Sequence, residues 1–114
     1  MTTAVTDEDV RKLAQTAKPF SLGLLRWAPA RNQDGADNTE REHQRRMVAL
    51  RNSGDIAVLC PVSSDSLCGL AIFTVPPEEA IEILKDDPCV KARMMSYEVH
   101  PCHGFPGDTL PHAT

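Results

Sequence analysis

The chain has 114 residues, of which 41% are hydrophobic and 25% are charged, and its formal net charge is −4. These values predict one soluble globular domain that can bury its own core. The negative charge argues against a nucleic-acid-binding surface, and no apolar run approaches the roughly 20 residues of a membrane-spanning helix. The N-terminus lacks a secretory signal pattern, so we expect a cytoplasmic protein with no nucleic-acid or membrane partner.

The four cysteines, Cys60, Cys68, Cys89 and Cys102, form no C-x-x-C pair. This spacing predicts reduced thiols that act as small hydrophobic residues. The run His100-Pro101-Cys102-His103 contains residue types that bind zinc or copper, but a tetrad with a proline rarely converges on one ion. We therefore expect no metal and no cofactor.

The chain begins with a predicted short helix. Thr6 and Asp9 form a T-x-x-D capping pattern, and Pro19 prevents the helix from continuing. Its apolar stripe is thin, so it could dock on the core or lie loosely outside it. The predicted organisation is an N-terminal helical extension over 1–18, a domain over 19–103 and a tail over 104–114.

Apolar runs and turn residues divide the domain into four strands and two helices. Thr39 and Glu42 predict a capping box that opens the first of these helices, and Gly54 ends it. Pro77 begins the next helix and Pro88 forces its end. The expected elements are a strand over 20–27, a helix over 39–53, strands over 56–60 and 67–75, a helix over 77–87 and a strand over 93–100.

This order of elements predicts a ferredoxin-like α+β fold, in which an antiparallel sheet carries both helices on one face. The strands are apolar on both faces, whereas antiparallel sheets that leave one face to water alternate apolar and polar residues. A bare apolar face would exceed what monomers usually expose. We therefore expect a homodimer in which two sheets pack together.

His43 is the first candidate for chemistry. It shares one side of its helix with Met47 and Leu50, so its ring should face the core. It also follows Thr39 by little more than one turn, where the helix dipole disfavours a protonated imidazole and would keep a neutral base. The alternative is a buried structural histidine bonded to a backbone carbonyl.

Asp87 is the second candidate. It follows Ala80 and Leu84 at spacings of seven and three, so it leans toward the apolar side of its helix. It would lie at the negative end of that helix, where a carboxylate needs a nearby imidazole or arginine. The alternative is a solvated aspartate that ends a helix before a proline. With an inward His43, a His–Asp dyad becomes the prediction: the carboxylate sets the tautomer and the imidazole moves a proton.

The chain carries an ordered set of short motifs: His43 with Gly54, Cys60-Pro61, Gly69 to Phe73, Glu78-Glu79-Ala80, Asp87 to Ala92 and Tyr97 to Pro101. This set resembles the YCII-related (YciI-like) family over about Phe20 to Gly107. The resemblance implies a dimeric α+β barrel, here with an extra N-terminal helix, and a cofactor-free pocket between sheet and helices. It also implies an acid–base pair, which would be His43 and Asp87. The residues expected to bind substrate are Arg26, Met47, Cys60, Pro61 and Arg93.

Three positions depart from the pattern of that family. It usually has Gly-Pro at Cys60-Pro61, a glycine near Arg93, and Pro-Trp at Pro101-Cys102. Relatives include a dehydrochlorinase that acts on a chlorinated hydroxyquinol. Because the departures touch the expected pocket rim or dimer seam, that substrate does not carry over to this chain.

The function expected from the sequence is a small cofactor-independent acid–base enzyme of the lyase, isomerase or cyclase type. Its ligand would be a small aromatic or carbonyl-bearing molecule. One alternative is a catalytically inactive dimer that binds a small molecule. Another is a cofactor-free monooxygenase of the dimeric α+β barrel class.

Overall fold

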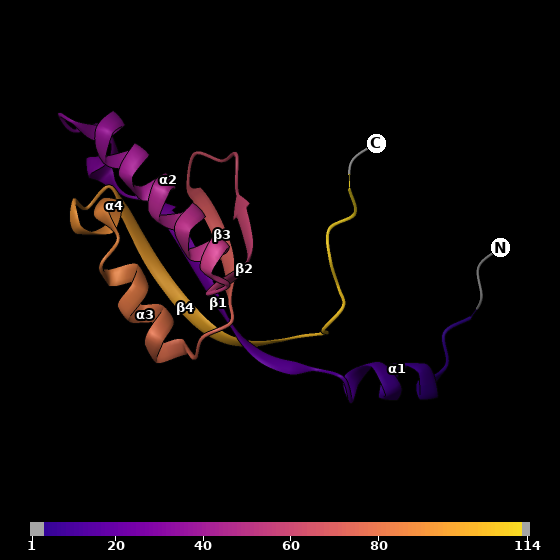
Figure 1. The fold of residues 1–114 in the computed structure, drawn as a ribbon. Helices are drawn as coiled ribbons and strands as arrows, with labels where there is room; N and C mark the ends of the chain where they lie inside the picture. The colour runs from indigo at the N-terminus through magenta and orange to yellow at the C-terminus, as the bar shows by residue number, and fades with distance from the viewer. Residues whose placement is uncertain (1–3, 113–114) are drawn as a thin grey trace.

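The computed structural model describes residues 4–112 as a four-stranded antiparallel sheet with helices packed on one face (Figure 1). The strand order is β2-β3-β1-β4, which confirms the expected ferredoxin-like α+β fold. The elements are α1 (Asp7–Ala14), β1 (Lys18–Trp27), a 3-10 turn (Pro29–Asn32), α2 (Ala36–Ser53), β2 (Ile56–Pro61), β3 (Leu67–Phe73), α3 (Pro77–Lys85), α4 (Pro88–Lys91) and β4 (Met95–Gly104).

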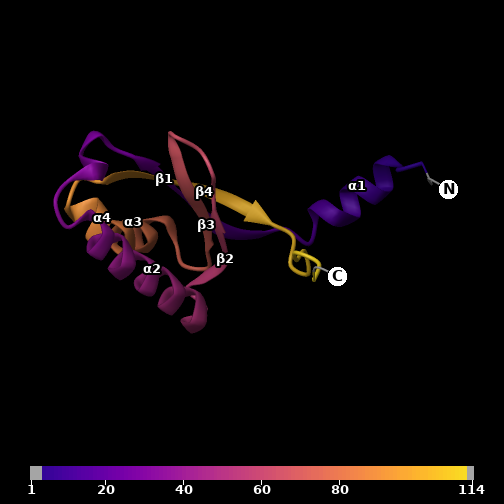
Figure 2. The ribbon, with the colours of Figure 1, turned by 90° about the horizontal axis from the view of Figure 1, so that it is seen from above.

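The two faces of the sheet have different surroundings. On the central strand β1, Ser21 and Leu25 are buried beneath the helices. The alternate residues Phe20, Leu22 and Leu24 point to the other face and are only partly buried. Helices α2, α3 and α4 lie on one side of the sheet, and within residues 4–112 no helix covers the other side (Figure 2).

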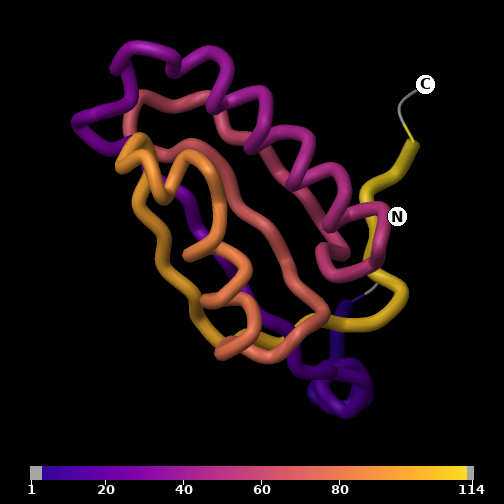
Figure 3. The backbone as a smooth tube through the Cα atoms, turned by 60° about the vertical axis from the view of Figure 1, so that its left-hand side comes forward, coloured from indigo at the N-terminus to yellow at the C-terminus, as the bar shows by residue number. Residues whose placement is uncertain are grey.

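The core lies between the sheet and the helices. Phe73, Ile56, Leu84 and Met94 are its largest fully buried hydrophobic side chains. They come from β3, β2, α3 and the turn before β4, so the core joins the sheet to α3 and to the turn that follows α4. Short α4 contacts both α2 and α3, and it lies at the turn between α3 and β4 (Figure 3).

The N-terminal helix lies apart from this core. Thr6 and Asp9 form the predicted capping box, with Asp9 N donating to Thr6 Oγ1 at 3.1 Å. No residue of α1 is buried, and Val10 and Leu13 are 59% and 50% exposed. Figures 1 and 2 show α1 projecting away from the sheet, beyond the start of β1. Of the two placements considered from the sequence, the structure has the one outside the core.

Helix α2 begins earlier than predicted. Its first residue is Ala36, and Gly35 precedes it in the left-handed region with φ 79°. The predicted capping box of Thr39 and Glu42 was wrong, because both residues lie inside the helix. The Thr39 hydroxyl donates to the Gly35 carbonyl at 3.2 Å, and Glu42 pairs with an arginine one turn along. The predicted end is confirmed, with Gly54 at φ 89°.

The C-terminal part of the domain also differs from the prediction. The expected strand from Arg93 to His100 begins instead at Met95 and continues to Gly104, which pairs with Lys18. The short helix α4 occupies the space before it and was not predicted. Among the helices of residues 4–112, none is both long and apolar enough to cross a membrane.

Candidate functional site

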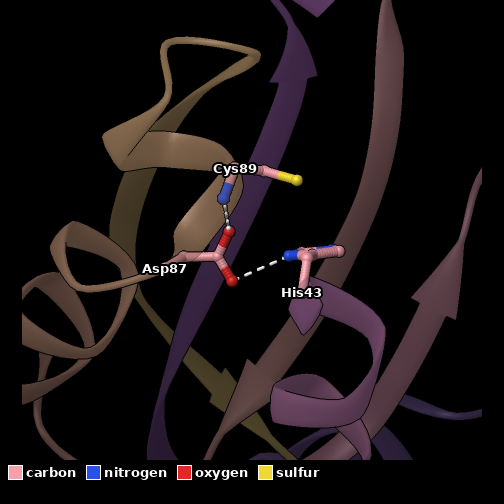
Figure 4. A group of neighbouring side chains, drawn as sticks. All are labelled: His43, Asp87 and Cys89. Atoms are coloured by element: carbon pink, nitrogen blue, oxygen red, sulfur yellow. Dashed lines mark hydrogen bonds and ion pairs between the residues drawn. The ribbon is translucent and has the colours of Figure 1, made fainter. Parts of the chain in front are cut away.

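The structure brings His43 and Asp87 into direct contact. His43 comes from α2, and Asp87 lies between α3 and α4; the His43 Nδ1 and Asp87 Oδ1 atoms are 2.7 Å apart (Figure 4). Asp87 is 0% exposed and His43 is 8% exposed. The alternatives of a solvated Asp-Pro terminator and of a histidine bonded to a backbone carbonyl were therefore wrong.

Asp87 tolerates burial because its other oxygen caps a helix. Its Oδ2 accepts hydrogen bonds from the backbone N–H groups of Cys89 at 2.9 Å and Val90 at 3.4 Å, at the start of α4. Asp87 is the N-cap and Pro88 is the first helical residue, a common pairing of residue types. The sequence placed Asp87 only at the negative end of α3, although it also lies at the positive end of α4.

A third side chain, Arg46, approaches the dyad. Its Nη1 lies 3.8 Å from Asp87 Oδ1 and is buried without a hydrogen-bond partner among residues 4–112. A nearby guanidinium offsets part of the cost of burying the Asp87 carboxylate. Arg46 follows His43 by three residues on α2, and that spacing was the signal that could have identified it.

The predicted helix-dipole effect on His43 was wrong. Because α2 begins at Ala36, His43 lies two turns into the helix. The dipole acts mainly on the first turn, so it has little influence here. The contact with Asp87 therefore determines which ring nitrogen carries the proton.

A pocket of about 520 Å³ opens beside His43, between α2 and the sheet. His43 Nε2 bonds to no residue within 4–112 and is not among the buried unpartnered atoms, so it remains accessible from this pocket. The walls are mostly apolar. The lining comprises Gly23, Leu25, Trp27, Glu40, His43, Gln44, Met47, Val48, Leu59, Cys60, Pro61, Val62, Cys68, Gly69, Leu70, Ala71, Phe73, Leu84 and Met95.

The residues expected to bind substrate have two kinds of position. Met47, Cys60 and Pro61 line the pocket. Arg26 and Arg93 do not: the Arg26 Nε donates to Glu98 Oε1 at 2.9 Å, and exposed Arg93 lies in the turn after α4. A role for these two arginines in ligand binding stays a prediction.

Cys89 lies next to the dyad. Donor atoms of His43, Asp87 and Cys89 all lie within 4.8 Å of one another, a grouping that can hold a metal ion. Burial, followed by the negative charges of Asp87 and Glu40, raises the pKa of Cys89 to about 12, whereas metal binding needs the thiolate. Both Asp87 oxygens already accept hydrogen bonds. A metal ion bound here would have to displace the Cys89 proton and compete with the hydrogen bonds of Asp87.

The sequence reasoning did not select Glu40 or Trp27, which also line the pocket. Glu40 precedes His43 by three residues and Met47 by seven, so one helical face presents all three. Trp27 ends β1, and the Arg31 guanidinium stacks 3.7 Å from its ring centre.

No protein-family model matches this chain, and no curated protein matches it.

Proposed function

We propose that this protein is a small cofactor-independent acid–base enzyme in which His43 moves a proton on a small, largely apolar ligand. The observation that carries the proposal is the position of the imidazole. One ring nitrogen is held by buried Asp87 at 2.7 Å, and the other is open to a pocket of about 520 Å³. A histidine arranged in this way has one nitrogen for orientation and one for proton transfer.

The chemistry follows from the two nitrogens. With the Nδ1–H donating to Asp87, Nε2 carries a lone pair and can accept a proton from the ligand. The imidazolium that forms is stabilised by the Asp87 carboxylate and can return the proton at another ligand atom. After proton removal next to a carbonyl, reprotonation at another carbon gives an isomer and loss of a leaving group gives a lyase product. Attack of the carbanion on a second electrophilic carbon of the ligand closes a ring. The resemblance to the YCII-related family supports the same assignment.

The experiment uses exchange of ligand protons in D₂O, because the substrate is unidentified. A panel of small ketones, aldehydes and phenols is incubated with the protein, and ¹H NMR records loss of the acidic C–H signals. We expect exchange with the wild type, none above background with His43→Ala, and about 10² times slower exchange with Asp87→Asn. His112→Gln is the control, since His112 is exposed in the C-terminal segment and does not line the pocket.

The alternatives give different results. Compounds that raise the melting temperature of wild type and His43→Ala equally, without exchange, would replace the proposal with a silent binding module. Oxygen uptake with a phenol would replace it with a monooxygenase. Exchange that persists in His43→Ala would overturn the assignment of His43.

We also propose that two copies pack through the open face of the sheet. Phe20, Leu22 and Leu24 on β1 lie on that face beside Ile72 of β3, and each is only partly buried in one copy. Covering them in a dimer would stabilise it by about 25 cal/mol for each Å² of apolar surface removed from water. We expect light scattering to give a dimer at micromolar concentration and Leu22→Lys to give a monomer. A monomeric wild type would overturn this part of the proposal.

A further inference from the structure

The pocket has an unbalanced charge. Its lining contains one carboxylate, that of Glu40, and no lysine or arginine. His43 is the only other ionisable side chain of the lining apart from the thiols of Cys60 and Cys68. A ligand in this pocket therefore meets an acid and no permanent cation.

Glu40 is available to a ligand. It is half-buried on α2, one turn before His43. Within residues 4–112 it takes part in none of the ion pairs, whereas Glu42 on the same helix pairs with Arg45. The nearby Arg31 stacks on Trp27 and does not line the pocket.

The pKa of Cys68, a thiol in the pocket lining, is raised in part by the same negative charge. Burial is the largest cause that raises the pKa of Cys68, and the carboxylate of Glu40 is the next. The positive charge of Arg31 lowers the pKa of Cys68, but the pKa remains raised overall. Glu40 is therefore close enough to Cys68 for its carboxylate to raise the pKa of a thiol that lines the pocket.

Glu40 and Trp27 both line the pocket, and both lie near the start of β3. Glu40 and Arg31 both shift the pKa of Cys68, which lies at the start of β3. The backbone N–H of Trp27 donates to the carbonyl of Ser66, just before that start, at 2.9 Å. One face of the Trp27 ring is taken by Arg31, whereas a carboxylate with no ion-pair partner among residues 4–112 can bind an ammonium group through charge-assisted hydrogen bonds. Apolar walls continue from there to Leu84 and Met95.

We propose that the pocket selects small apolar amines in their protonated form, with the ammonium held by Glu40 and the apolar body extending beside His43. This inference rests on one part of the proposed function, that the pocket binds a small ligand. It does not depend on proton transfer by His43. Glu40 would determine specificity, while His43 would carry the chemistry. Carboxylate-bearing ligands would be rejected because nothing in the lining offers them a cation.

The experiment compares three probes of similar shape: 2-phenylethylamine, 2-phenylethanol and phenylacetate. Binding to the full chain is measured by titration with ¹H–¹⁵N NMR at neutral pH. We expect the amine to bind about tenfold more tightly than the alcohol, because a charge-assisted hydrogen bond forms only with the amine. Phenylacetate should bind most weakly.

Three variants test the role of Glu40. Glu40→Gln should remove the preference for the amine and leave the affinity for the alcohol within about twofold. Glu40→Lys should reverse the preference toward phenylacetate. Glu42→Gln is the matched control, because Glu42 lies on the same helix outside the pocket lining, and it should behave as the wild type.

The results separate this inference from the proposed function. His43→Ala should keep the amine preference while losing proton exchange. A preference that survives Glu40→Gln would overturn the assignment of Glu40. Equal binding of amine and phenylacetate by the wild type, or no binding of any probe at millimolar concentration, would overturn the ligand class.

Discussion

Asp87 holds His43 with one carboxylate oxygen and the start of α4 with the other. The contact with His43 Nδ1 is 2.7 Å, and the contact with the Cys89 backbone N–H is 2.9 Å. One buried side chain thus links α2 to α4 across 44 residues of sequence. Orientation of the imidazole and formation of α4 therefore depend on the same group.

Removal of Asp87 should destabilise the fold far more than a change to asparagine. Asp87→Ala loses the helix cap, leaves the His43 N–H without a buried acceptor and leaves the Arg46 guanidinium without its nearby negative charge, so we expect a loss of about 3 kcal/mol in the free energy of unfolding. Asparagine can still cap α4 with its carbonyl oxygen, and its amide NH2 can donate to Nδ1 of the other His43 tautomer, so Asp87→Asn should lose only about 1 kcal/mol. Urea unfolding followed by circular dichroism measures both. Equal losses would contradict the double role of Asp87.

The neutral His43 ring should carry its proton on Nδ1. The Asp87 carboxylate accepts that hydrogen at 2.7 Å, which favours this tautomer. Long-range ¹H–¹⁵N correlation spectra distinguish the two ring nitrogens directly. His112 is exposed and serves as the control for an unconstrained ring. A His43 ring protonated on Nε2 would contradict the arrangement.

The free energy of unfolding should fall above about pH 9, and ionisation of Cys89 should cause part of that fall. The folded protein raises the pKa of this thiol from 9.0 to about 12, chiefly through burial. Between these values the unfolded chain releases the proton while the folded protein keeps it, so raising the pH favours unfolding. For one proton, the free energy of unfolding falls by at most about 1.4 kcal/mol for each unit of pH.

The matched variant is Cys89→Ala, which lacks the ionisable thiol and whose loss of packing does not change with pH. Urea unfolding at several pH values from 8 to 10, under reducing conditions, should show a shallower decline for the variant. The other thiols with raised pKa values, Cys68 and Cys102, contribute equally to both proteins. Identical declines would show that Cys89 ionises normally.

Arg93→Gly should stabilise the protein. Arg93 is the only non-glycine residue of 4–112 in the left-handed region, with φ 62°, where a Cβ atom is unfavourable. Glycine removes this strain but gains freedom in the unfolded chain, so we expect a net increase of about 0.5–1 kcal/mol in the free energy of unfolding. Arg93→Ala keeps the Cβ and should show no such gain. Equal stabilities of the two variants, measured by thermal unfolding, would contradict the strain.

The amino-acid pattern alone determined the fold. Alternating and continuous apolar runs identified the four strands, and Gly54 and Pro77 marked helix ends that the structure confirms. These signals are local, because a helix or strand must present its apolar side chains with the period of its own backbone. The inward direction of His43 followed from the same periodicity, whereas Asp87 is buried although it lies beyond the end of α3, where helical periodicity does not apply.

The tertiary structure decided the rest of the site. The start of α2 at Ala36 depends on a left-handed Gly35, and α4 forms because Asp87 caps it within the core. Arg46 and Glu40 acquire their positions only when α2 packs against α4 and the sheet. Such features join residues distant in sequence, so spacing along one helix indicates which side chains share a face but not which partner or cavity that face will meet.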